Sequence, residues 1–315
     1  MSDPRGIVSK ADIAVQNLID DGGYLNPIQA NTFLRMVQEQ PTLTGQVRYV
    51  AMPAPTMEIN KIGFASRILK AAPTAGSALP AGSRSAPTTD QITLTTKKVI
   101  AEVHIPYDVL EDNIERGSLE DTIMAQITER VSLDLEELLL LGDTVSGGDA
   151  FLRLHNGVLK LAVSHVVDYT GSSDNITKAI FKAGLRTMPN KYLRNRAQIR
   201  FFVSPNVETE YADYLAGRLT VLGDTRLEAN YTGLMSPFGI PLQSLALMPD
   251  ANYLMTHPKN MILGVQRDIM IESDRDIRTQ VLIIVVTMRV AIQYEEEDAV
   301  VKCIGLAPEA ISTTT

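Results

Sequence analysis

The stretch YDVLEDNIERGSLEDTIMAQITERVSLDLEELLLLGD, from Tyr107 to Asp143, decides the fold because its second part is a single long helix. Ser118 is a favourable N-cap, Asp121 follows in the acidic position of a capping box, and Gly142 is a typical left-handed stop. At about 1.5 Å per residue, a helix from Leu119 to Leu141 is roughly 35 Å long. Its apolar residues recur every three or four positions on one face: Leu119, Ile123, Ile127, Val131, Leu135 and Leu138.

The opposite face of this helix is acidic. Carboxylates in the first turn suit the helix dipole, but Glu136 and Glu137 near the C-terminus oppose it. A solvated face explains such a stripe, and so does a basic partner that lies across it. The acidic residues, opposed only by Arg130, are Glu120, Glu129, Asp134, Glu136 and Glu137.

Composition indicates a soluble globular chain with a real core. The 315 residues are 45% hydrophobic and 21% charged, enough for two domains or one elaborated domain. The formal net charge of −8 argues against free nucleic acid as a ligand for the surface as a whole. A single cysteine, Cys303, excludes an internal disulfide framework and fits a reducing cytosol. The N-terminus lacks a signal-peptide core, and the longest apolar run, Val281 to Met288, is too short to cross a bilayer.

Residues 46–103 predict two strands that carry a long projecting tip. VRYVAMP, TMEINKIGF and ITLTTKKVIAEVHIP have strand character, whereas Lys70 to Gln91 consists almost entirely of Ala, Pro, Gly, Ser and Thr. A loop this long in a compact protein should be functional or mobile.

The predicted hairpin is basic, whereas the helical stretch is acidic. Six Lys and Arg face Asp90 alone between Lys61 and Lys98, while Tyr107 to Asp143 holds eleven carboxylates against two arginines. Opposite charges on separate surfaces favour contact between copies. The predicted contact residues are Arg67, Lys70 and Arg84 on the hairpin, and Glu129, Asp134, Glu136 and Glu137 on the helix.

The rest of the chain mixes helices and strands without βαβ alternation, which favours an α+β class. We expect a helix capped at Asp174 that ends before Pro189, and a second helix that follows Asn206 and stops at Gly217. QIRFFVSP is a buried strand, and two long strands are expected at Gln280–Tyr294 and Ala299–Leu306.

Motifs for catalysis or cofactor binding are missing from the sequence. The four histidines, His104, His155, His165 and His257, stand at unrelated spacings without a cluster of metal ligands. No phosphate-binding glycine motif or nucleophile elbow occurs, and Cys303 lies in an apolar strand as a small hydrophobe. We therefore expect no catalytic residues, no cofactor and no metal.

The order of these elements resembles that of tailed-phage major capsid proteins, which have the Hong Kong 97 type fold. IPYDVLEDN, LHNGVL, FFVSPN, FGIPL and HPKNMILGVQRDIMIESDRDI also look like this family. The resemblance implies an α+β capsid fold in six parts: an N-terminal arm (1–45), an extended loop (46–103), a peripheral domain with the spine helix (104–150), an axial domain (151–263), long strands of the peripheral domain (264–300), and a C-terminal return to the axial domain (301–315).

The same resemblance implies a binding function rather than an enzyme. Hexamers and pentamers would form an icosahedral head that encloses double-stranded DNA without reading its sequence. A portal and a decoration protein are implied partners. The short N-terminal segment indicates a separate scaffolding protein instead of a cleaved one. The virion, assembled in the host cytoplasm, is the expected location, with no membrane contact. Two alternatives stay open: an encapsulin-type nanocompartment shell and a soluble α+β enzyme.

Overall fold

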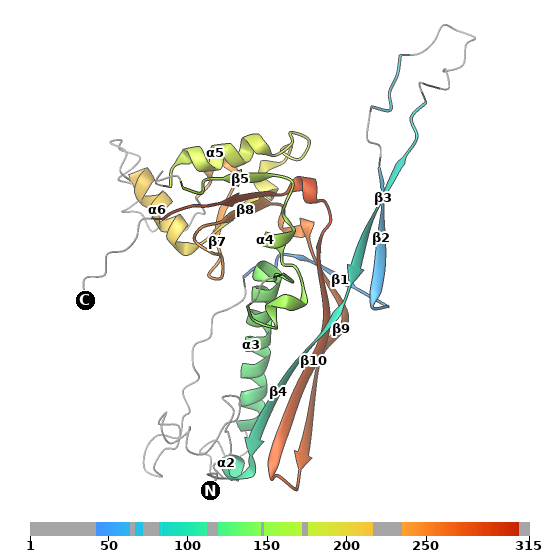
Figure 1. The fold of residues 1–315 in the computed structure, drawn as a ribbon, viewed down its shortest axis with the longest axis vertical. Coiled ribbons are helices and arrows are strands. Elements are labelled where there is room, and N and C mark those ends of the chain that lie inside the picture. Colours follow the sequence, from blue (N-terminus) through green and yellow to red (C-terminus); the bar gives the residue numbers. More distant parts are fainter. Residues whose placement is uncertain are drawn as a thin grey trace.

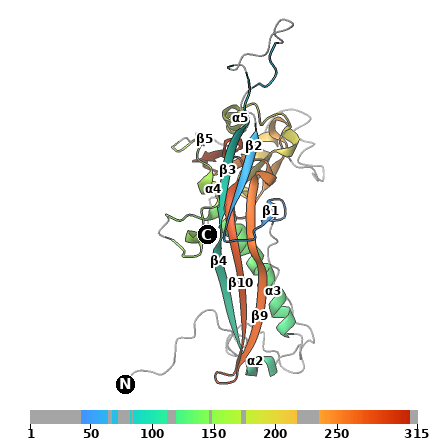
Figure 2. The same cartoon turned by 90° about the vertical axis from the view of Figure 1, so that its right-hand side faces the viewer.

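A 23-residue helix, α3 (Leu119–Leu141), runs alongside a long sheet in the computed structural model (Figures 1 and 2). Its bounds confirm the predicted helix, although the proposed cap, Ser118, lies outside the described residues. The structure describes residues 42–63, 67–71, 82, 84–111, 119–145, 148–171, 176–216 and 235–308. A short helix, α2 (Tyr107–Glu111), precedes α3 at the end of the sheet farthest from the projecting hairpin (Figure 1).

The long sheet has four strands in the order β1-β9-β10-β4. Its centre is an antiparallel pair, β9 (Met261–Asp276) and β10 (Val281–Tyr294). The flanking strands are β1 (Arg48–Ala51), parallel to β9, and β4 (Lys97–Pro106), antiparallel to β10. Buried and half-buried residues alternate along β10 up to Val290, as expected for a strand with one face in a core.

The C-terminal end of α3 is buried on several sides. Leu138, Leu139 and Leu140 are all inaccessible to solvent, so the apolar surface there is wider than the single face that the sequence indicates. They share one cluster with residues of β9 and β10, with Phe202, and with the short helix α4 (Val158–Leu161). This cluster joins the helix to the long sheet and to a second, five-stranded sheet.

The strands predicted around the long tip form an antiparallel hairpin, β2 (Thr56–Gly63) and β3 (Thr88–Thr95). The hairpin projects from the body (Figure 1). Only Thr96 separates β3 from β4, which lies in the long sheet. The hairpin therefore continues directly from the body.

A second lobe contains a five-stranded sheet in the order β5-β11-β8-β6-β7. We call it the five-stranded lobe. Its strands are β5 (Val166–Asp168), β11 (Val301–Ile304), β8 (Tyr253–Thr256), β6 (Arg200–Val203) and β7 (Leu242–Ser244). Two helices, α5 (Lys178–Thr187) and α6 (Pro205–Ala216), share its main apolar cluster. Short 3₁₀ helices join the elements: η2 (Leu152–Leu154), η3 (Arg196–Gln198), η4 (Pro237–Gly239), η5 (Pro258–Asn260) and η6 (Glu297–Ala299).

Alternation along β6 gives the two faces of this sheet different partners. Phe201 and Val203 face the cluster with α5 and α6, whereas Phe202 faces the cluster that contains the end of α3. The aromatic rings of Phe181 and Phe201 meet edge to face with centroids 5.0 Å apart. The lobe is thus packed on both sides of its sheet.

Several predicted boundaries differ from the structure, among them the start of α6, at Pro205 instead of after Asn206. α5 begins at Lys178, where the side chain of Thr177 accepts a hydrogen bond from Ala179 N, so Thr177 is the cap in place of Asp174. β11 begins at Val301 because the preceding residues turn as η6. The local sequence pattern did not delimit β9, although the family resemblance implies long strands over 264–300; its 16 residues form the longest strand described. Asp174 and the predicted stop Gly217 lie outside the described residues.

Candidate assembly surfaces

The base of the projecting hairpin is packed against the body along one face. Ile92 and Leu94 of β3 are buried, and they point in the same direction because they stand two residues apart. Leu94 shares a small apolar cluster with Met52, Ile262 and Ala291. The hairpin is therefore joined to the long sheet near its base only.

Lys61 ties the base of the hairpin to the acidic turn after β10. Its ammonium donates hydrogen bonds to the carbonyl oxygen of Glu295 and to the carboxylate of Glu296. A carboxylate oxygen of Asp90, on the facing strand, lies 3.5 Å away. The positive charge of Lys61, counted with the hairpin in the sequence, is consequently neutralised within the chain.

Farther out, the hairpin carries exposed cations and exposed apolar side chains. Arg67, Lys70 and Arg84 are all exposed and form no ion pair with any other described residue. Between the first two, Leu69 is 83% exposed. An exposed leucine flanked by two free cations on a projecting element is typical of a contact surface.

The predicted acidic residues of α3 differ in their surroundings. Glu129 is exposed, and Glu137 is partly buried. Asp134 pairs with Arg130 at 2.9 Å, one helical turn away. Burial raises the pKa of Asp134 above its usual value and outweighs the opposing effect of Arg130. These three carboxylates remain available to a partner at the surface.

Glu136 lies inside the chain and not on the acidic face. It is only 3% exposed, and its carboxylate accepts hydrogen bonds from Leu43 N at 3.0 Å and from Thr42 Oγ1 at 3.4 Å. The reason is the wide apolar surface at the end of α3, which turns this part of the helix inward on several sides. Glu136 therefore positions the first described residues of the chain.

The basic and acidic surfaces do not meet within one copy. Figure 1 shows the hairpin extending from one end of the molecule, whereas α3 runs toward the other end. Each surface must find its counter-charge in solvent or in another molecule. This geometry supports the contact between copies that the charge pattern predicts.

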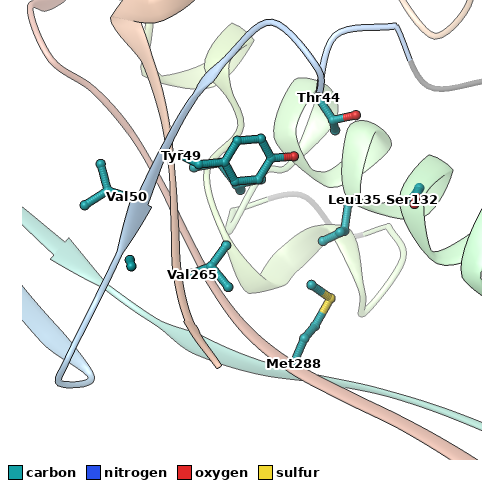
Figure 3. Close-up of a pocket in the computed structure, with 9 residues that line it drawn as sticks. Thr44, Tyr49, Val50, Ser132, Leu135, Val265 and Met288 are labelled. Carbon is teal, nitrogen blue, oxygen red and sulfur yellow. The ribbon is translucent and has the colours of Figure 1, made fainter. Parts of the chain in front are cut away.

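A hollow of about 250 Å³ lies between α3 and the long sheet, beside β1 (Figure 3). Its lining is mostly apolar, with hydroxyl groups at its rim. Burial, followed by the negative charge of Glu136, raises the pKa of the Tyr49 hydroxyl. The lining residues are Thr44, Tyr49, Val50, Ala51, Ser132, Leu135, Leu263, Val265 and Met288. The lining holds no carboxylate, histidine or cysteine, so its hydroxyl groups have no general base beside them in the hollow to activate them.

Two histidines and the cysteine outside this hollow have structural roles. His155 is buried and bonds through Nε2 to the Val290 carbonyl at 2.8 Å, and His257 Nδ1 accepts a hydrogen bond from Lys259 N. Cys303 is buried, as predicted, and burial raises its thiol pKa to about 12, which leaves it unreactive. Among the described residues, no three His, Cys, Asp or Glu side chains are grouped to bind a metal. No helix in the described ranges could span a membrane.

Sequence reasoning missed two features of these surfaces. The burial of Glu136 depends on Thr42 and Leu43, which are more than ninety positions away in the chain. A local sequence pattern therefore cannot predict it. The pairing of Lys61 with Glu295 and Glu296 has the same long-range character. The run of acidic residues at Glu295 to Asp298 was one available signal, since it needs a cation nearby.

The chain is similar to known proteins in sequence and in fold. No family model matches the chain. A Bacillus subtilis (strain 168) protein assigned as the prophage capsid protein YqbE is 44% identical over 310 residues, which cover 95% of this chain and 97% of that protein.

Three solved structures share the fold at low sequence identity. The capsid of a native GTA particle has a TM-score of 0.64 at 16% identity, covering 93% of this chain and all of that one. The satellite phage P4 procapsid has a TM-score of 0.65 at 14% identity, covering 95% and 100%. The SrpI encapsulin complex of Synechococcus elongatus PCC 7942 has a TM-score of 0.59 at 10% identity, covering 94% and 98%.

These matches show the fold of phage capsid proteins, and encapsulin shares it. The relatives are structural proteins, so the protein is not an enzyme, and the soluble-enzyme alternative is set aside. The identity to the prophage protein extends over almost the whole of both chains. The chain therefore belongs to the family of phage capsid proteins and is a major capsid protein.

Proposed function

We propose that many copies of this chain form hexamers and pentamers that close into an icosahedral phage head around double-stranded DNA. The observation that carries this proposal is the 44% identity to a prophage capsid protein across 95% of the chain. The projecting hairpin supports it, because its exposed cations and Leu69 have no partner surface among the described residues of one copy. Enclosure of DNA without sequence-specific binding fits a net charge of −8.

We infer the functional parts from the family layout. The arm is 1–45, and the extended loop is 46–103. The peripheral domain combines 104–150 with 264–300, and the axial domain combines 151–263 with the return at 301–315. A separate scaffolding protein, a portal and a decoration protein are proposed partners, with assembly in the host cytoplasm.

The proposed contact places the hairpin of one copy over α3 of a neighbour. Arg67, Lys70 and Arg84 would meet Glu129, Asp134 and Glu137. Each exposed ion pair contributes about 0–1 kcal/mol, so charge mainly selects the partner and the register. Burial of Leu69 adds about 1.5–3 kcal/mol per contact. Because every copy makes several such contacts, modest energies accumulate across a shell.

Charge reversal at the hairpin tests the proposed contact. The variant Arg67→Glu/Lys70→Glu/Arg84→Glu should lose shells and capsomers in light scattering and negative-stain images. Its thermal unfolding should stay that of the wild type, since all three side chains are exposed. The control, Arg67→Lys/Lys70→Arg/Arg84→Lys, preserves every charge and should assemble. Normal particles from the reversed variant would contradict the proposed contact.

A shell that holds a protein cargo is the second candidate, because the encapsulin structure covers 94% of this chain. The two functions differ in what the shell contains. Purified particles should release double-stranded DNA that is sensitive to nuclease after disruption. One discrete co-purifying protein in place of DNA would favour the compartment.

A further inference from the structure

The five-stranded lobe carries an uneven distribution of charge that the proposed hairpin contact does not use. From Lys178 to Arg200 the chain has seven basic residues and no carboxylate. The described residues 201–216 and 235–258 have the reverse composition, with carboxylates and no Lys or Arg. The basic residues are Lys178, Lys182, Arg186, Lys191, Arg194, Arg196 and Arg200, and the acidic ones are Glu208, Glu210, Asp213 and Asp250.

The fold places the helix-borne members of these two sets toward different edges of one sheet, on α5 and on α6, whereas Arg196 and Arg200 lie in η3 and β6, next to β7. In the strand order, β5 and β7 are the two outermost strands. α5 contacts β5 and its neighbour β11, whereas α6 contacts β7. Figure 1 shows α5 above β5 and α6 to its left. Both helices pack on the same face of the sheet, where the rings of Phe181 and Tyr211 meet with centroids 4.8 Å apart. We call the outward surface of α5 the α5 edge, which is basic, and that of α6 the α6 edge, which is acidic.

The two helices turn their charged residues away from the core. On α5, Ile180 and Phe181 are buried, while Lys178, Lys182 and Arg186 stand at four-residue spacing and are exposed, as expected for one outward face. On α6, Val207 and Tyr211 are buried, Asp213 is exposed and Glu208 is half-buried. Each helix therefore presents charge of one sign to its surroundings, while the carboxylate of Asp168 lies exposed at the end of β5.

Most of the basic charges are not neutralised within the copy. Lys191 lies 3.8 Å from Asp298, but both side chains are more than half exposed, so this pair is weak. Lys182, Arg186 and the remaining exposed cations of the α5 edge form no ion pair with another described residue. The α5 edge has a surplus of positive charge that a partner of opposite sign would match.

We propose that the α5 edge of one copy docks against the α6 edge of the next copy around each capsomer. This inference rests on the proposed function, because hexamers and pentamers are rings. A ring needs a head-to-tail interface, in which two different surfaces of the same chain complement each other. Edges of opposite charge meet that need and also disfavour pairing of two like edges.

A charge-reversal cycle tests the docking. On the helices themselves, Lys182→Glu/Arg186→Glu changes the charge of α5 from +3 to −1, so both edges are acidic. Glu208→Lys/Asp213→Lys changes the charge of α6 from −3 to +1, so both edges are basic. Each variant should lower the assembled fraction at least about tenfold in light scattering at low salt, since every contact in the ring becomes repulsive. A chain with all four substitutions exchanges the two signs and should recover assembly. The control, Lys182→Arg/Arg186→Lys, should assemble as the wild type does.

Mixing the two reversed variants gives a sharper result. A copy with two acidic edges can pair only with a copy with two basic edges, so the mixture must alternate around the ring. Six positions allow strict alternation, and five do not. Equal amounts of the two variants should therefore restore hexamers but not pentamers, as counted by native mass spectrometry.

The outcomes separate this inference from its alternatives. Normal assembly of both reversed variants, or no recovery in the four-substitution chain, would overturn the docking while leaving the proposed function intact. Suppose that only Lys182→Glu/Arg186→Glu differed from the wild type, and only by enclosing less DNA. The α5 edge would then bind phosphate, and the docking would be wrong. A wild-type chain that forms neither rings nor shells would contradict the proposed function itself. Thermal unfolding of each variant checks that the fold persists.

Discussion

The five-stranded lobe and the projecting hairpin differ in how they are stabilised. The lobe has its own core, in which Phe181, Phe201 and Tyr253 are fully buried and their rings are in contact. The hairpin buries only Ile92 and Leu94 among the sixteen residues of its two strands. Two strands by themselves are at most marginally stable in water.

The two regions therefore differ in what their sequences encode: contacts within one copy in the lobe, and contacts between copies in the outer hairpin. The lobe is specified by contacts within the chain, so substitutions there should change the stability of one copy. The hairpin is specified within the chain at its base only, so substitutions farther out should change assembly and leave unfolding unaffected.

Removal of an aromatic ring from the lobe should have the largest effect. Phe201→Ala deletes a fully buried side chain that packs edge to face against Phe181 and Tyr253. We expect a loss of about 3–5 kcal/mol in the free energy of unfolding, since large-to-small changes leave a cavity. Urea unfolding followed by circular dichroism measures the loss.

A truncation on the hairpin is the matched control. Ile62 is 73% exposed, so Ile62→Ala should change the free energy of unfolding by less than about 0.5 kcal/mol. If the two variants were equally destabilised, the hairpin would have a core contact that the structure does not show. The distinction between a lobe that stabilises one copy and a hairpin that acts in assembly would then be wrong.

Glu136 should give the next largest effect. Glu136→Ala leaves Leu43 N without its acceptor in a buried place, which costs about 1–3 kcal/mol. Glu136→Gln keeps an acceptor oxygen and should recover part of this loss. Urea unfolding of both variants, beside Glu137→Ala at the adjacent and less buried position, measures the difference. Equal losses at the two positions would contradict the specific role of Glu136.

Lys61 should affect the hairpin locally. Lys61→Ala removes the hydrogen bonds to Glu295 and Glu296, for an expected cost of about 0.5–1.5 kcal/mol. Hydrogen exchange should become faster in β2 and β3 and stay unchanged in β9 and β10, since the hairpin can open without the long sheet. Uniform acceleration over both regions would show that the hairpin is not a separate opening unit.

Local patterns in the sequence were enough for some elements and not for others. The period of α3 and the β-branched run of β10 predicted both elements to within a residue, because one buried face produces each pattern. The local pattern did not delimit β9, because polar residues interrupt its apolar positions over the part of the strand that β1 leaves unpaired. A strand at a partly open edge has no strict alternation to detect.

Some residues of the candidate surfaces could likewise be predicted from the sequence, and others could not. Arg67, Lys70 and Arg84 could be proposed from the sequence because an exposed loop leaves its charges unpaired. Lys61 and Glu136 were assigned to the same surfaces, yet both are paired within the chain. Their partners come from segments distant in sequence, so only the fold shows that these charges are already neutralised.

His155 should give the smallest effect, as a dependence of stability on pH. Burial lowers its pKa in the folded protein, the nearby charge of Lys97 adds to this, and the bond to the Val290 carbonyl opposes it. The unfolded chain therefore binds a proton more readily near its ordinary pKa of about 6.5. Stability from this group is complete above that pH and declines as the pH falls toward the lower folded value. His155→Gln cannot titrate, so the gap in unfolding free energy between wild type and variant should shrink from about pH 7.5 to about pH 5.5. A gap that stays constant would mean that His155 keeps the same pKa in the folded and unfolded chains.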